Sequence, residues 1–360
     1  MGWTLSRYFF LRYVVITSWF FIGISALVFI IDFTELSSRT SDIPGFSAGL
    51  ALSVSAMRVP MVMQQTVPFI ALFAAMATLV SLNRKYELVV ARSVGVSAWQ
   101  FLRPACFGAL LLGLLTVGVM NPIAAAGYSR AEEIEASYRS GNGAAVAASA
   151  PWIRQTTRAG DTIIGARSVL NQGLELVDAV FFRIDNADNI AERLDARSAY
   201  LRNGHWELHD VSRMVEGSLP QKIESLEVET NLRPEFVQER LARPDTIPFF
   251  ELPAKIEVAR SFGLKANAFA MQFHSLVALP LLLVAMTLIA ATVSMRFARL
   301  GQSATMILGG IVAGFLLYVS SVLVKAFGTA GFVPPAIAAW LPVVVAMFFG
   351  VTFLLYKEDG

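Results

Sequence analysis

The chain has 360 residues, of which 55% are hydrophobic and 16% are charged, and its formal net charge is +2. With a mean hydropathy of +0.58, a chain of this length is too apolar for a water-soluble globular protein, so the composition predicts an integral membrane protein. Cys106 is the only cysteine and lies in an apolar run, which excludes a disulfide framework and a thiolate metal site within the chain.

Three long apolar runs in the first 126 residues predict three membrane spans. The runs are Tyr13–Ile31, Val59–Leu82 and Pro104–Ala126, and each is long enough to cross a hydrocarbon core of about 30 Å. The first run has no clear cleavage site for a signal peptidase, so we expect it to be retained as a span. Pro44 and Gly45 break the chain before the second run.

A short charged stretch, Asn83–Ser97 with the sequence NRKYELVVARSVGVS, separates the second and third runs. It is predicted to form a helix on the membrane surface, with Asn83 as its N-cap, Glu87 near the positive end of the helix dipole and Gly95 as its C-terminal stop. Two interpretations are open. The helix either lies among anionic lipid head groups, with Glu87 paired to Arg84, or it is a docking site for another protein.

Between Gly127 and Lys265 the sequence becomes polar and slightly acidic, which argues against a nucleic acid partner. After a helical start and a linker of small residues, six short segments alternate apolar and polar residues between turn residues. This pattern predicts antiparallel strands in a sandwich or a roll. The six segments are 152–158, 161–170, 174–184, 190–202, 205–216 and 222–232, and an amphipathic piece at 249–263 is expected to be a helix that returns to the membrane.

Three more apolar runs follow, at Ala266–Met295, Leu300–Val324 and Ala336–Tyr356. The predicted organisation is therefore three spans in residues 1–126, an inserted β domain in residues 127–265 and three spans in residues 266–360. By the positive-inside rule, both termini and the charged stretch are cytoplasmic, and the β domain is outside, in the periplasm of a Gram-negative cell. The basic residues that decide this orientation are Arg7, Arg12, Arg84, Lys85, Arg92, Arg103, Arg296, Arg299 and Lys357.

The sequence contains no motif for catalysis or energy conversion. It has no GxxxxGK[ST] phosphate loop, no cluster of metal ligands and no convincing pairing of a nucleophile with a base. Apart from His274, the spans carry almost no ionisable side chain that would relay protons or sodium ions. A chain of this kind that takes part in ATP-driven transport would depend on a separate ATPase subunit, and we expect neither a metal nor a cofactor in this chain.

Several features together resemble the LptF/LptG (YjgP/YjgQ) family, the permease subunits of the ABC transporter that exports lipopolysaccharide. They are the segment YELVVARSVGVS, the three-plus-three arrangement of spans around a β domain, the WIR segment at 152–154 and the turn GFVPPAIAAWLP before the last span. The resemblance covers essentially the whole chain, and these details look closer to LptG than to LptF.

The resemblance implies a function and a set of partners. The chain would be a non-catalytic permease that extracts lipopolysaccharide from the inner membrane and passes it to a periplasmic bridge. Its partners would be an LptB-type ATPase dimer that binds ATP and magnesium, an LptF-type sister permease, an LptC-type membrane-anchored bridge protein and an LptA-like periplasmic bridge. Two alternatives stay open: a membrane sensor or assembly factor with a ligand-binding β domain, and an ABC permease for another envelope lipid.

The resemblance also assigns residues to a docking site. In the family, the stretch after the second span is the coupling helix, which seats in a groove of the ATPase, and Glu87 matches the acidic residue of that helix. Leu88, Val89 and Arg92 would surround Glu87, and Gly95 would end the helix. The β domain would be a jellyroll that stacks with similar domains of the partners to form a path for lipid.

A cavity for lipopolysaccharide needs apolar walls and cations at its rim, because the lipid carries acyl chains and phosphates. The wall candidates are Phe29, Phe33 and Phe315, and the rim candidates are Arg39, Arg58, Arg130 and Lys325. Each phenylalanine could instead face lipid or pack within the bundle, and each cation could be an ordinary snorkelling anchor. Family members carry lysines near the outer end of the first span, where this chain has Asp32 and Glu35. Arg39, a bridging divalent cation or a lipid A with fewer phosphates would have to compensate.

Overall fold

The computed structural model describes residues 2–40, 47–139, 152–157, 160–170, 174–184, 190–202, 204–215, 219–230, 244–261, 266–294 and 303–358. Three features discussed above lie outside these ranges: the break at Pro44 and Gly45, the linker at 140–150 and the turn that carries Arg296 and Arg299.

Six helical segments of the described chain are long and apolar enough to cross a membrane, as the sequence predicts. The first half comprises α1 (Trp3–Thr40), α2 (Ala48–Arg84) and a third span built from α4 (Ala98–Leu115), the π-helix η1 (Thr116–Met120) and α5 (Asn121–Arg139). The second half comprises α8 (Asn267–Ser294), α9 (Ser303–Ala330) and α10 (Pro335–Glu358). The short helices are α3 (Glu87–Ser93), the 3-10 helix η4 (Pro244–Thr246) and α7 (Leu252–Ser261).

Polar caps explain where two of the spans begin. Ser47 precedes α2, and its side chain accepts a hydrogen bond from the backbone N–H of Leu50. Ser97 precedes α4 and forms a capping box with Gln100, in which each side chain bonds to the backbone of the other residue. These caps satisfy N–H groups that have no partner within the helix.

Several spans run beyond the apolar runs that predicted them, and α1 and α9 are two examples. Helix α1 continues to Thr40, and the ion pair between Glu35 and Arg39, at 2.5 Å, supports this polar last turn. Helix α9 continues to Ala330, so Lys325 lies more than one turn inside its end rather than at the end. The apolar run fixes only the part of a helix that lies in hydrocarbon, and the helix itself continues until a residue or contact stops it.

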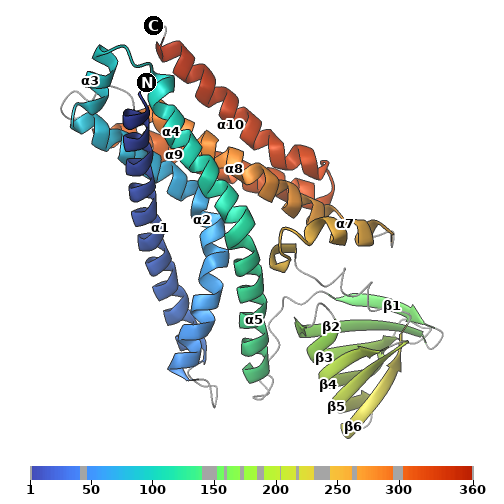
Figure 1. Ribbon diagram of the computed structural model, residues 1–360. Coiled ribbons are helices and arrows are strands. Elements are labelled where there is room, and N and C mark those ends of the chain that lie inside the picture. The colour runs from blue at the N-terminus through green and yellow to red at the C-terminus, as the bar shows by residue number, and fades with distance from the viewer. Residues whose placement is uncertain are drawn as a thin grey trace.

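Helices α2 and α8 form the centre of the bundle, and α1, α9 and α10 lie around them (Figure 1). In the apolar stretches of α2 and α8, 61% of the residues are buried, whereas in those of α1 and α9 only 6% and 11% are buried. Glycines allow the central contacts, because a Cβ at Gly113 would overlap Pro280 of α8 and a Cβ at Gly314 would overlap Leu72 of α2. Helices α1 and α9 therefore keep most of their apolar surface free of contacts within the chain.

The six segments predicted as strands all form strands, in one antiparallel sheet with the order β1-β2-β3-β4-β5-β6. The strands are β1 (Ile153–Thr157), β2 (Gly160–Leu170), β3 (Glu175–Ile184), β4 (Ile190–Arg202), β5 (His205–Val215) and β6 (Gln221–Glu229). The side chain of Gln155 on β1 donates to the carbonyl of Glu229 on β6, at 3.2 Å, although β1 and β6 are the two edges of the sheet. The sheet therefore curls into a roll, and within the described residues there is one rolled sheet rather than a two-sheet sandwich.

Candidate functional site

The short helix α3 follows the second span at the end of the molecule that also holds both termini (Figure 1). It is shorter than the predicted Asn83–Ser97 helix, because α2 continues to Arg84 and takes up Asn83 in its last turn. Tyr86 separates the two helices with a φ of 58°, which breaks the helical path. The prediction that Asn83 caps the docking helix is therefore wrong.

The C-terminal end of α3 is closed by Gly95, as the sequence predicts. Gly95 has a φ of 86°, which favours glycine. Its N–H bonds to the carbonyl of Arg92 at 2.9 Å, and the N–H of Val96 bonds to the carbonyl of Ala91 at 3.1 Å. This pair of bonds is a Schellman motif, so the backbone after α3 has a defined path into α4.

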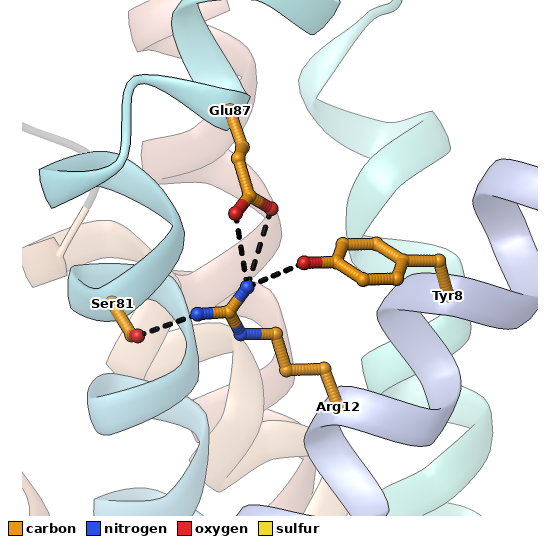
Figure 2. Close-up of polar contacts among 4 residues, drawn as sticks. All are labelled: Tyr8, Arg12, Ser81 and Glu87. Atoms are coloured by element: carbon orange, nitrogen blue, oxygen red, sulfur yellow. Dashed lines mark hydrogen bonds and ion pairs between the residues drawn. The ribbon is translucent and has the colours of Figure 1, made fainter.

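Glu87, the first residue of α3, is bound to Arg12 of α1 (Figure 2). One guanidinium nitrogen of Arg12 lies 3.0 and 3.3 Å from the two carboxylate oxygens of Glu87. The same guanidinium donates to the hydroxyl of Tyr8 at 2.6 Å and to the hydroxyl of Ser81 on α2 at 2.8 Å. Arg12 thus ties α1, α2 and α3 together, and Glu87 is paired with Arg12 rather than with Arg84.

The bond between Arg12 and Glu87 is shielded from solvent. Their side chains are 16% and 27% exposed. Charge-assisted hydrogen bonds are stronger than neutral ones, and a partly buried charge that loses its partner is destabilising by roughly 1–3 kcal/mol. The four-residue group of Tyr8, Arg12, Ser81 and Glu87, here called the Arg12 clamp, therefore restrains α3 in one orientation.

Helix α3 has a buried face and an exposed face. Leu88 and Ala91 are 6% and 7% exposed. Leu88 belongs to an apolar cluster with residues of α2, α4 and α8. Tyr86, Val90 and Val94 are 70%, 61% and 77% exposed and follow one another at intervals of four residues. These three residues, here called the α3 stripe, form an apolar surface that no other residue described by the structure covers. The structure thus places Leu88 against the bundle and the α3 stripe, which the sequence pattern does not indicate, on the outside.

The predicted docking residues Val89 and Arg92 take no part in the hydrogen bonds of the Arg12 clamp described above. Val89 is half-buried, and Arg92 is exposed. The guanidinium carbon of Arg92 lies 5.9 Å from the centre of the Phe101 ring, which is a cation–π contact with α4.

Three of the four predicted rim cations have partners within the chain. Arg39 pairs with Glu35 on its own helix, and Arg58 of α2 pairs with Glu135 of α5. Lys325 of α9 donates to the side-chain oxygen of Gln272 on α8 at 3.2 Å. The structure therefore uses Arg58 and Lys325 as links between helices.

Arg130 is the rim candidate that is exposed at a hollow. The hollow has a volume of about 420 Å³ and is lined by Ala126, Ser129, Arg130, Glu133 and Ile134 of α5. Of the wall candidates, Phe29 and Phe33 are half-buried and stack on each other at 6.2 Å, whereas Phe315 is exposed.

Comparison with known families gives a match, which covers nearly the whole chain. The family model of the lipopolysaccharide export system permease LptF/LptG matches residues 7–357, which include both membrane halves and the β domain. The chain belongs to the LptF/LptG family. A search of curated proteins finds no match.

Membership of the LptF/LptG family makes the chain a lipopolysaccharide export permease of an ABC transporter, which works with other Lpt components. The six membrane spans are those of a multi-pass membrane protein. The family model covers LptF and LptG together, so the closer likeness to LptG stays a prediction.

In this LptF/LptG permease, sequence reasoning missed the residue at the centre of the site. Arg12 was used only to orient the first span, and nothing in the spacing indicated its contact with Glu87, 75 residues away. One signal was present: Arg12 lies immediately before an uninterrupted apolar run, where a charge is expensive to bury unless it is paired.

Proposed function

We propose that this permease transmits the work of a separate ATPase to the extraction of lipopolysaccharide from the inner membrane. The ATPase is an LptB-type dimer that binds ATP and magnesium, and an LptF-type sister permease completes the lipid cavity. LptC-type and LptA-like proteins receive the lipid on the periplasmic side. The family match supports this proposal at the level of lipopolysaccharide export, and α3 supports the role of transmission.

The observation that carries the proposal is the two-sided construction of α3. On its inner side, the Arg12 clamp binds α3 to α1 and α2. On its outer side, the α3 stripe offers three apolar side chains to a partner. A helix that is fixed to two spans and apolar on the opposite face is suited to turn a push from the ATPase into a movement of those spans.

Glu87 has a different role in this proposal from the one that the family resemblance implies. In the free chain its charge is already neutralised by Arg12, so a direct bond to a basic residue of the ATPase would require an exchange of partners. Glu87 instead sets the orientation of α3, and the α3 stripe makes the contact with the ATPase.

The distribution of charge supports an orientation with α3 in the cytoplasm. Both termini and α3 lie at one end of the helical bundle, and the β domain lies towards the other end (Figure 1). Basic residues are concentrated at the first end, and such residues favour the cytoplasmic side. They include Arg7, Arg84, Lys85, Arg92 and Arg103.

The contact with the ATPase is tested by placing a charge in the α3 stripe. We expect Val90→Glu and Val94→Glu to abolish copurification with an LptB-type ATPase, because a carboxylate would have to be desolvated in the interface. Val90→Leu keeps an apolar surface and should copurify as the native chain does. If both glutamate variants copurify with as much ATPase as the native chain does, the α3 stripe is not the docking surface. If the native chain itself copurifies with no ATPase, a function as a membrane sensor is favoured.

A further inference from the structure

A buried asparagine at the start of α5 joins three parts of the chain: α5 itself, α2 and the segment around Phe249. Asn121, the first residue of α5, is wholly buried. Its side-chain nitrogen donates to the side-chain oxygen of Gln64 on α2 at 3.1 Å, and its oxygen accepts from the backbone N–H of Phe249 at 2.7 Å. Because a backbone N–H can only donate, the amide oxygen of Asn121 must face Phe249, and this fixes which group faces Gln64.

A π-helix immediately before Asn121 determines the direction of its side chain. The helical path from α4 to α5 is interrupted by η1 (Thr116–Met120). A π-turn holds about one residue more than an α-turn, so it rotates every later residue by roughly 100° about the helix axis. Without this turn, Asn121 would point away from Gln64 and Phe249. Such single-turn π segments occur frequently at functional positions.

The segment around Phe249 is the return path of the chain from the β domain to the membrane. It is firmly attached to the spans, because Ile247, Leu252 and Ala259 belong to the same apolar core as residues of α2 and α8. The ring of Phe249 also stacks on that of Phe273 in α8, with centres 5.5 Å apart and planes at 7°. Since α5 leads into the β domain and Phe249 leads out of it, Asn121 holds the two connections of that domain together.

Helix α2 connects this polar joint with the Arg12 clamp. Gln64 and Ser81 lie on the same helix, about 26 Å apart at 1.5 Å per residue. Pro68 follows Gln64 by four residues and has no N–H, so the carbonyl of Gln64 lacks its usual partner within the helix. Helix α2 therefore has one weakened point, at Pro68 close to the joint, within the continuous helix that connects the joint to the clamp.

We propose that Asn121 is a positioning residue through which a movement of α2, imposed at α3, reaches the β domain during lipid transfer. The proposal rests on the transport function proposed above and adds the route from the docking helix to the domain that receives the lipid. Gln64 passes the movement to Asn121, and Asn121 passes it to the backbone at Phe249.

The test compares two variants of Asn121 whose new side chains are close in size to asparagine. Each variant is assembled with the ATPase and the sister permease, and the complex is reconstituted in vesicles that contain lipopolysaccharide. Asn121→Leu loses both bonds. Asn121→Asp can still accept from Phe249, and the amide of Gln64 can turn to donate to it. The measurements are ATP hydrolysis, the lipid released per ATP to a soluble acceptor, and hydrogen exchange at the amide of Phe249 with and without nucleotide.

For Asn121→Leu we expect sustained ATP hydrolysis, a loss of five-fold or more in lipid released per ATP, and loss of the nucleotide-dependent change in exchange at Phe249. Asn121→Asp should restore both readouts to near the native level. If Asn121→Leu does not assemble, Gln64→Leu provides the test, because it breaks the link to α2 and leaves the bond to Phe249.

Provided that the native complex exports lipid, either of two results overturns the inference. One is that the leucine variants release the native amount of lipid per ATP. The other is that Asn121→Asp fails as completely as Asn121→Leu, which would reveal a packing defect. If the native complex itself hydrolyses ATP and releases no lipid, the proposed function fails, and this outcome is visible without any variant.

Discussion

Arg58 of α2 and Arg130 of α5 have the same charge and lie on helices that pack against each other, but their surroundings differ. Arg58 is 20% exposed and pairs with Glu135, which is 10% exposed, so it links α2 to α5. Arg130 is exposed and lines a hollow with Ser129 and Glu133. A guanidinium that is open to its surroundings can bind a lipid phosphate, whereas one that is paired with a buried carboxylate would first have to give up that ion pair.

Substitution of these two arginines by glutamine should therefore have opposite effects. We expect Arg58→Gln to lower the free energy of unfolding by roughly 1–3 kcal/mol, because the partly buried ion pair with Glu135 is lost. Arg130→Gln should leave thermal stability unchanged and weaken the stimulation of ATP hydrolysis by lipopolysaccharide. Melting curves in detergent and lipid titrations of the complex measure the two effects. Full lipid stimulation of the Arg130 variant would remove this residue from the lipid site.

At the scale of elements, the β sheet contains a crease that crosses its middle strands. Along β4, buried side chains alternate up to Ala196 and resume at Ala199, a step of three residues instead of two. Asp178 and Asp210 lie at the same level on β3 and β5, with φ of 49° and 52°. Asp178 forms an ion pair of 3.0 Å with Arg167 of β2. The crease bends the sheet and explains why its two edges approach each other.

Asp178 should make the stability of this crease depend on pH. Burial raises the pKa of Asp178 above its ordinary value, and Arg167 and Arg197 only partly oppose this. A raised pKa in the folded state favours the protonated acid, so the contribution to stability is present below the unfolded pKa and is lost as pH rises through the folded pKa. Asp178→Asn stays neutral, so the fall in stability as the pH rises above about 4 should be smaller than in the native chain.

Hydrogen exchange over β3 and β4 of the full chain measures this difference. Asp210→Asn is the matched control, because Asp210 also has a positive φ but is 65% exposed in its side chain. It should leave the pH dependence as it is in the native chain. If the stability of the Asp178 variant depends on pH in the same way as that of the native chain, the burial of Asp178 does not contribute to the pH dependence of stability.

The sequence predicted the type of each element much better than its contacts. The six spans and six strands followed from apolar runs and from alternation, which depend only on neighbouring residues. Gly95 was predictable for the same reason. Asn83 was misassigned because a residue that can cap a helix can also sit in the last turn of the preceding one, and the left-handed conformation of Tyr86 has no signal in its residue type.

The candidate site depends on contacts between distant segments, and these could not be predicted. The bond from Arg12 to Glu87 spans 75 residues, and the bond from Phe249 to Asn121 spans 128. Both depend on how the helices pack, and the second also depends on a π-helix that changes the direction of Asn121. The α3 stripe likewise became visible only when Leu88 and Ala91 were seen to be buried.

In the whole molecule, the helical bundle has a buried centre, formed by α2 and α8, and apolar outer faces on α1 and α9 that few residues of the described chain cover. In a membrane such faces meet lipid or another subunit, which fits the sister permease in the proposed function. The Arg12 clamp connects the docking helix to α1, which has one of the outer faces, and to α2, in the buried centre.

In the proposed function, Glu87 acts through Arg12 rather than through a basic residue of the ATPase. A charge exchange tests it most directly, with Glu87→Arg, Arg12→Glu and the double variant each assembled with the ATPase and the sister permease. We expect each single variant to lose lipid-stimulated ATP hydrolysis about ten-fold, a change equivalent to about 1.4 kcal/mol, and the double variant to recover most of it. A double variant as inactive as Glu87→Arg alone would contradict the account, because Glu87 would then be needed for a contact outside this chain.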